Sequence, residues 1–162
     1  MTRAFIAVPL PESIRASLLM LDRSEQGISW SSPNRWHITL QFFEDADMGH
    51  LERLFFQIEA QEAVGSLGPR VRRLGQRILM VPVDGLSGVA NQVRTATAPQ
   101  SSNDQLPFVG HITLGRMKET GSAALEGTPI GGVFRVNQLL LVESRIDSGG
   151  HAHTVVGSQP LL

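Results

Sequence analysis

Apolar and polar residues alternate along several short stretches of the chain, which is the period of half-buried β-strands. This alternation predicts six strands, over about residues 3–8, 36–43, 78–83, 109–117, 133–146 and 154–161. Val71 marks one further short strand, on the other side of a turn at Gly75. A second turn is predicted at residues 84–85, where Asp and Gly follow an apolar run.

Three other stretches carry apolar residues at the three- and four-residue spacing of an amphipathic helix. They cover about residues 11–24, 47–63 and 86–98. The first has Pro11 in its opening turn and Gly27 just beyond its end, and Asp47 is a suitable N-cap for the second. Residues 121–132 are rich in Gly, Ala, Pro and Thr and predict either a mobile loop or a short helix.

The order of these elements, β-α-β-α-β-β-α-β, is typical of an α+β protein with antiparallel sheets and helices on the outside. No linker clearly divides the chain. Its 162 residues, 41% of them hydrophobic, suffice for one well-buried core or for two small lobes that share one. We therefore predict a single domain over residues 1–162.

One tetrapeptide, HITL, occurs twice, at residues 37–40 and 111–114. Side chains on a strand alternate between its two faces, so in each copy His and Thr share one face while Ile and Leu share the other. The apolar pair can anchor in a core while the imidazole and the hydroxyl point outward. If the two strands lie side by side, two imidazoles and two hydroxyls converge on one cleft, and such a set suits phosphate chemistry.

A tetrapeptide can recur by accident, so its content and placement matter more than its identity. The chain has only five His, and two of them open the repeats. Each copy also follows a loop that contains a proline, Pro33 or Pro107. The alternative interpretation is two unrelated half-buried strands whose histidines have structural roles.

Four stretches extend the pattern over nearly the whole chain: residues 3–11 (RAFIAVPLP), 33–43 (PNRWHITLQFF), 107–116 (PFVGHITLGR) and 139–144 (LLLVES). In content and order they resemble the two-histidine phosphoesterases, in particular the bacterial and archaeal RNA 2′,3′-cyclic phosphodiesterases once named 2′-5′ RNA ligases. The signature of that family is a pair of His-x-Thr/Ser-x motifs. The resemblance implies two pseudo-symmetric lobes of antiparallel sheet with outer helices, each lobe contributing one motif to a central groove.

The chain departs from the family pattern at three places. Glu44 stands where the family usually has Gly, and Gly110 stands where Pro is common. A Tyr often occurs in the family within the stretch that corresponds to residues 149–154, whereas this protein has no Tyr. These departures affect the expected details of nucleotide binding rather than the chemistry.

The paired motifs predict the catalytic residues His37 and His111, because an imidazole with a pKa of about 6.5 can serve as base or acid near neutral pH. Thr39 and Thr113 lie on the same faces and can donate hydrogen bonds to phosphoryl oxygens. The symmetry of the motifs leaves the two proton roles nearly interchangeable. We assign His111 as the base that activates water and His37 as the acid that protonates the leaving 3′-oxygen.

Arg116 is a further candidate for substrate binding, because a guanidinium matches a phosphate with two parallel hydrogen bonds. It lies five residues from His111, so strict alternation places it on the opposite face. A bulge at Gly115 could turn the Arg116 side chain back to the face of His111. The alternative is a solvated Arg at a strand end, and the same choice applies to Arg35, which precedes the first motif.

Three aromatic residues flank the first motif. Parity places Trp36 and Phe42 on the face of Ile38, and Phe43 on the face of His37. An aromatic ring at an exposed strand end could stack on a base, but core packing is the favoured interpretation.

The other histidines offer no complete metal site. His50 is predicted at the surface near a helix start, and His151 and His153 form at most half a site, with only Asp147 near them in the chain. The chain also lacks a glycine-rich phosphate loop. We therefore expect neither a metal nor a cofactor.

Composition limits the class of protein further. The net charge of −1 means that affinity for RNA must come from a local patch rather than from the overall field. The absence of Cys excludes disulfides, iron–sulfur clusters and thiolate zinc sites. No secretory signal or membrane-spanning stretch is evident, so we expect a cytoplasmic monomer with no membrane partner.

The leading functional hypothesis is an enzyme of RNA processing, a metal-independent RNA 2′,3′-cyclic phosphodiesterase that leaves a 2′-phosphate. Its substrates would be RNA ends or nucleoside 2′,3′-cyclic phosphates. The alternatives are a 2′-5′ RNA ligase, a phosphodiesterase for another cyclic nucleotide or a 2′-5′ oligonucleotide, and a non-catalytic module that binds RNA ends.

Overall fold

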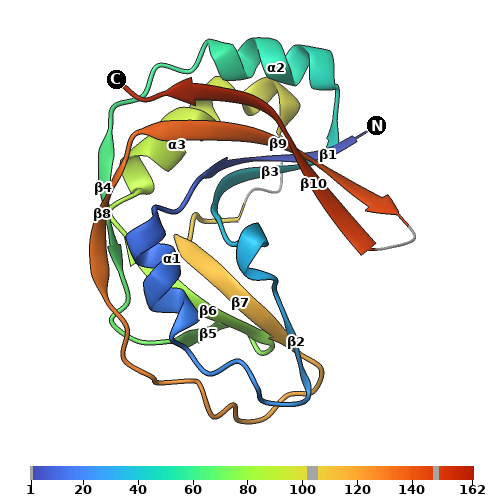
Figure 1. The fold of residues 1–162 in the computed structure, drawn as a ribbon. Helices are drawn as coiled ribbons and strands as arrows, with labels where there is room; N and C mark the ends of the chain where they lie inside the picture. The colour runs from blue at the N-terminus through green and yellow to red at the C-terminus, as the bar shows by residue number, and fades with distance from the viewer. Residues whose placement is uncertain (1, 102–105, 148–149) are drawn as a thin grey trace.

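Two antiparallel sheets dominate this computed structural model, which describes residues 2–101, 106–147 and 150–162 (Figure 1). The four-stranded sheet has the order β10-β9-β1-β3, with β1 at Thr2–Val8, β3 at Ile38–Ala46, β9 at Gln138–Asp147 and β10 at Gly150–Pro160. The six-stranded sheet has the order β2-β7-β6-β4-β8, and β5 pairs with β6. Its strands are β2 (Ile28–Trp30), β4 (Ala63–Leu67), β5 (Arg72–Leu74), β6 (Ile78–Asp84), β7 (His111–Met117) and β8 (Gly132–Val136).

The three predicted helices are present, and all of them are shorter than expected. They are α1 (Glu12–Leu19), α2 (Met48–Phe56) and α3 (Ser87–Ala96). The side chain of Asp47 accepts a hydrogen bond from the backbone N–H of His50, as predicted for an N-cap. The first helix ends at Leu19, and beyond it Asp22 accepts hydrogen bonds from the N–H and hydroxyl of Ser24, which form a local turn within the stretch predicted as helix.

Figure 1 shows α2 and α3 on the outer side of the four-stranded sheet and α1 beside the six-stranded sheet. Two short 3₁₀ turns, Pro33–Arg35 and Ala98–Gln100, complete the described helical structure. The guanidinium of Arg15 in α1 donates to the carbonyl of Pro33, so α1 supports the turn that leads into the first motif. None of the described helices is long and apolar enough to cross a membrane.

Several strand predictions need correction. The predicted strand over residues 133–146 is two strands that belong to different sheets: β8 ends just before Asn137, and β9 begins just after it. Phe134 and Val136 are buried before this residue, and Leu139 and Leu141 after it, so the alternation shifts by one residue there. Strands β2 and β4 were not predicted, and residues 121–132 contain no helix before β8 begins.

One hydrophobic core connects the two sheets. The Ile and Leu of both HITL copies are buried in it, with 0% exposure for all four side chains: Ile38, Leu40, Ile112 and Leu114. Burial of one such side chain contributes about 1.5–3 kcal/mol. This confirms the predicted anchoring of each motif and the predicted α+β class with antiparallel sheets and outer helices.

Candidate active site

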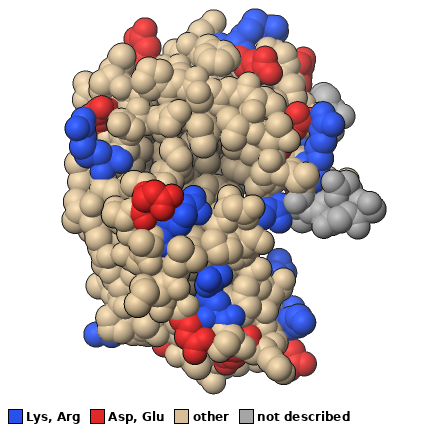
Figure 2. Space-filling view, in the orientation of Figure 1, with Lys and Arg blue, Asp and Glu red and all other residues tan. Residues whose placement is uncertain are grey.

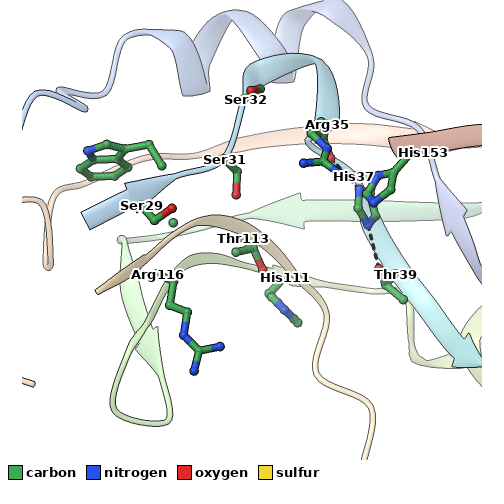
Figure 3. Close-up of a pocket in the computed structure, with 12 residues that line it drawn as sticks. Ser29, Ser31, Ser32, Arg35, His37, Thr39, His111, Thr113, Arg116 and His153 are labelled. Atoms are coloured by element: carbon green, nitrogen blue, oxygen red, sulfur yellow. Dashed lines mark hydrogen bonds between the residues drawn. The ribbon is translucent and has the colours of Figure 1, made fainter. Parts of the chain in front are cut away.

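Both motifs face one pocket of about 390 Å³ (Figure 3). Strands β3 and β7 belong to different sheets, so the motifs meet across the groove between the sheets and do not pair with each other. The five residues predicted from the sequence all line this pocket: His37, Thr39, His111, Thr113 and Arg116. Figure 2 shows the molecule hollowed between its two sheets, with Lys and Arg side chains near the hollow.

A β-bulge in each motif strand explains how side chains beyond the motif are oriented. In the pairing of β1 with β3, the partners of two consecutive β1 residues are Gln41 and Thr39, so Leu40 has no partner in β1. In the pairing of β6 with β7, the partners of two consecutive β6 residues are Gly115 and Thr113, so Leu114 has no partner in β6. The extra residue resets the alternation of the faces.

The bulge at Leu114 places Arg116 on the pocket side, where strict alternation would not put it. The extra residue is Leu114 itself rather than Gly115, the position considered from the sequence. A Cβ at Gly115 would lie 2.9 Å from the carbonyl oxygen of Ser29 and 3.2 Å from the ring of Trp30. Glycine at 115 therefore allows the close approach of β2.

The bulge at Leu40 reverses the prediction for the two phenylalanines. Phe43 is 2% exposed and packs in the core, whereas Phe42 is 47% exposed. Phe42 pairs directly with Phe5 of β1, and Phe5 stacks on the ring of His37. Parity had assigned these faces the other way round, because the bulge was not visible in the sequence. Trp36 is buried, as the favoured interpretation predicted.

The imidazole of His37 is held at both nitrogens. Its Nδ1 lies 2.6 Å from the carbonyl oxygen of Arg35, and its Nε2 lies 2.9 Å from Oγ1 of Thr39. A carbonyl only accepts, so Nδ1 carries a proton, and Nε2 of the neutral ring accepts from the hydroxyl of Thr39. Burial lowers the pKa of His37, with the positive charges of His111 and Arg35 adding to the effect and the bond to the Arg35 carbonyl opposing it.

His111 is held at one nitrogen in the same manner. Its Nδ1 lies 2.6 Å from the carbonyl oxygen of Val109, two residues earlier. Nδ1 of His37 lies at the same distance from the carbonyl oxygen of Arg35, also two residues earlier. The proton is thereby assigned to Nδ1, and Nε2 of the neutral ring is left with its lone pair. Nε2 of His111 is thus available for proton transfer, whereas Nε2 of His37 is bonded to Thr39.

The pocket favours an anion. Arg35 and Arg116 line it, and none of its described lining residues is acidic. Three hydroxyls from β2 and the following loop, those of Ser29, Ser31 and Ser32, add further donors. The sequence did not single out these serines, because the three residues of β2 give too short a pattern.

His153 is the functional candidate that sequence reasoning missed. It was considered there only as half of a metal site with His151, whose side chain lies outside the described residues. The structure places His153 in the pocket beside His37 (Figure 3). Among the described side chains, no group of three or more His, Cys, Asp or Glu is arranged to hold a metal.

Comparison with solved structures identifies the fold. A phosphoesterase matches over 99% of both chains, with a TM-score of 0.80 and 22% identity. E. coli LigT without ligand matches over 99% of this chain and 97% of its own, with a TM-score of 0.78 and 24% identity. The protein TT0787 of Thermus thermophilus matches over 98% of this chain and 97% of its own, with a TM-score of 0.77 and 22% identity.

E. coli LigT has been solved in complex with 3′-AMP and with phosphate. No protein-family model matches the present sequence, and a search of curated proteins gives no match. The structural matches are full-length, and they confirm the resemblance at the level of the fold. The chain has the α+β fold of LigT and related phosphoesterases.

Proposed function

We propose that this protein is a two-histidine phosphoesterase that hydrolyses RNA 2′,3′-cyclic phosphates to 2′-phosphates. One observation carries the proposal. Two identical His-x-Thr units from different sheets present their imidazoles and hydroxyls to one pocket that also holds two arginines. The fold shared with LigT, a protein solved with 3′-AMP and with phosphate, supports the same class of substrate.

The hydrolysis would use one imidazole as base and the other as acid. The base takes a proton from water as the water oxygen attacks phosphorus. The bond from phosphorus to the ribose 3′-oxygen breaks, and the acid gives that oxygen its proton, so the product carries a 2′-phosphate. The hydroxyl of Thr113 and the guanidinium of Arg116 would bind the non-bridging oxygens, where negative charge is concentrated. The hydroxyl of Thr39 donates to Nε2 of neutral His37 and would be released for the same role once that ring is protonated.

The assignment of His111 as base and His37 as acid is part of this proposal. In the protein without substrate, burial keeps His37 largely neutral at neutral pH, because it lowers the pKa of that ring. An anionic phosphodiester in the pocket would favour its protonation. The protonated ring would then give its proton to the leaving oxygen, and burial, which disfavours the charged imidazole, would favour that transfer.

The direct test is turnover of nucleoside 2′,3′-cyclic phosphates, with the product isomer identified by NMR or chromatography. We expect a 2′-phosphate, and activity that persists in excess EDTA, because the described pocket residues include no carboxylate or thiolate ligand. A 3′-phosphate would mean that the substrate lies in the groove in the opposite direction. Binding of cyclic nucleotides without any turnover would indicate an RNA-end-binding module instead.

The same acid–base pair could also act on 2′-5′ linkages. A 2′-5′ dinucleotide offered as substrate, and oligonucleotides with 2′,3′-cyclic and 5′-hydroxyl ends offered for joining, would separate these activities. We expect hydrolysis of the cyclic phosphate to be the fastest of the three reactions. Faster cleavage of a 2′-5′ linkage, or faster joining, would replace the proposed substrate.

A further inference from the structure

A third imidazole enters the pocket from the C-terminal strand β10. His153 pairs with Ser144 of β9, and Ser144 pairs with Arg3 of β1. Phe5 of β1 pairs with Val142 of β9, two residues from Ser144. Residues two apart on a strand share a face, so His153 and Phe5 lie on the same face of the four-stranded sheet.

The rings of Phe5, His37 and His153 form one cluster. The ring of His37 stacks on that of Phe5, with centroids 4.6 Å apart and an angle of 15° between their planes. The ring of His153 stands nearly perpendicular to both, with centroid distances of 5.0 Å to Phe5 and 5.9 Å to His37. Stacked and edge-to-face pairs at these distances are both favourable.

These contacts restrain a motion that the hydrogen bonds of His37 leave open. Bonds at Nδ1 and Nε2 fix the direction of the ring, but the ring can still rock about the line that joins their partners. Phe5 lies against one face of the ring, and the ring of His153 stands nearly perpendicular to it. His111 has no aromatic neighbour among the described rings, so only the first motif is restrained in this way.

We propose that His153 is a positioning residue, which holds the imidazole of His37 against Phe5 so that Nε2 keeps its place beside Oγ1 of Thr39 in the pocket. The catalytic part of this inference rests on the proposed function, whereas the structural part does not. His153 lies beside the ring of His37, and burial lowers the pKa of that ring. The C-terminal strand would thereby complete a site whose catalytic residues come from β7 and the start of β3.

The test compares His153→Ala, which removes the ring, with His153→Phe, which keeps a ring of similar shape. His50→Ala is the matched control, because His50 bonds to Gln100 and does not line the pocket. The first measurement is an NMR titration of the His37 ring nitrogens in the protein without substrate, repeated with inorganic phosphate as probe. The second is kcat and KM for a nucleoside 2′,3′-cyclic phosphate.

In His153→Ala we expect the pKa of His37 to rise toward the ordinary value of about 6.5, because solvent reaches the ring. We also expect kcat to fall about tenfold while KM changes less than about threefold, since a small displacement of a catalytic group mainly slows the reaction. His153→Phe should keep the low pKa and most of kcat. His50→Ala should match the wild type in both measurements.

Two results would overturn the proposal. An unchanged His37 pKa and unchanged kcat in His153→Ala would show that the ring restrains nothing. A His153→Phe variant as slow as His153→Ala would show that the imidazole acts on the substrate itself. If the wild type fails to hydrolyse any cyclic phosphate, the proposed function fails, and the NMR titration still decides the role of His153.

Discussion

The two motif strands have the same burial pattern and different surroundings. Residues 38–43 of β3 and 112–117 of β7 show the same sequence of buried, half-buried and exposed positions, and each strand has its bulge at the leucine of HITL. After the bulge, the corresponding exposed residues are Phe42 and Arg116. Of these two residues Arg116 lines the pocket, whereas Phe42 is exposed outside its lining.

The histidines differ in a similar way. His37 is bonded at both nitrogens and packs against Phe5 and His153, whereas His111 is bonded at Nδ1 and has no aromatic neighbour among the described rings. The repeated tetrapeptide thus sets where the imidazoles lie. The residues that are not repeated determine how firmly each imidazole is held and what surrounds it, and this asymmetry is the basis for two different proton roles.

The largest expected effect is the loss of either imidazole. His37→Ala and His111→Ala should each reduce kcat by roughly 10²–10⁴-fold, the usual contribution of a general acid or base, and both variants should fold. The double variant should be little slower than the single ones, because the pair acts as a unit. Steady-state kinetics with a cyclic nucleotide measures this. Near wild-type activity in either single variant would contradict the two-histidine mechanism.

The two threonines should show the asymmetry directly. Thr39→Val and Thr113→Val keep the shape of the side chain and remove one donor, so each should cost about 1–3 kcal/mol in transition-state stabilisation. Thr39 also bonds to Nε2 of His37, so its loss should change the pH–rate profile as well. If both variants shift the profile equally, the difference between the motifs is not functional.

Arg116 and Phe42 should contribute to binding of different parts of the substrate. Arg116→Ala should raise KM about tenfold at low salt and less at high salt, because a screened charge contributes less. Phe42→Ala should raise KM about threefold, independently of salt, through lost stacking on a base. Arg135→Ala is the matched control, since Arg135 pairs with Glu62 and does not line the pocket. A salt-independent effect of Arg116→Ala would remove the phosphate role.

The smallest expected effect is on stability. Because the pKa of His37 is lowered in the folded protein, the unfolded chain takes up this proton first as the pH falls. The free energy of unfolding should therefore decrease below about pH 6.5 and level off below the pKa of His37 in the folded state. Urea titrations of wild type and His37→Gln at several pH values would show this, and a wild-type curve parallel to that of the variant would contradict it.

The sequence allowed prediction of the elements with a clear period and of the two motifs, because the alternation of Ile and Leu with His and Thr is local. It could not reveal the bulges at Leu40 and Leu114, which depend on how β1 and β6 pair with the motif strands. The predicted faces of Phe42 and Phe43 were therefore wrong. The place of His153 depends on the pairing of β10 with β9.

The most direct test of the central claim replaces the leaving group. In a nitrophenyl phosphodiester of a nucleotide, the leaving group is nitrophenolate, which needs no proton to leave. A variant that lacks the acid should therefore recover much of its lost activity on this substrate, while a variant that lacks the base should not. We predict recovery in His37→Ala and none in His111→Ala. Recovery in His111→Ala alone would reverse the assignment, and equal behaviour of the two variants would contradict the division of one acid and one base between the motifs.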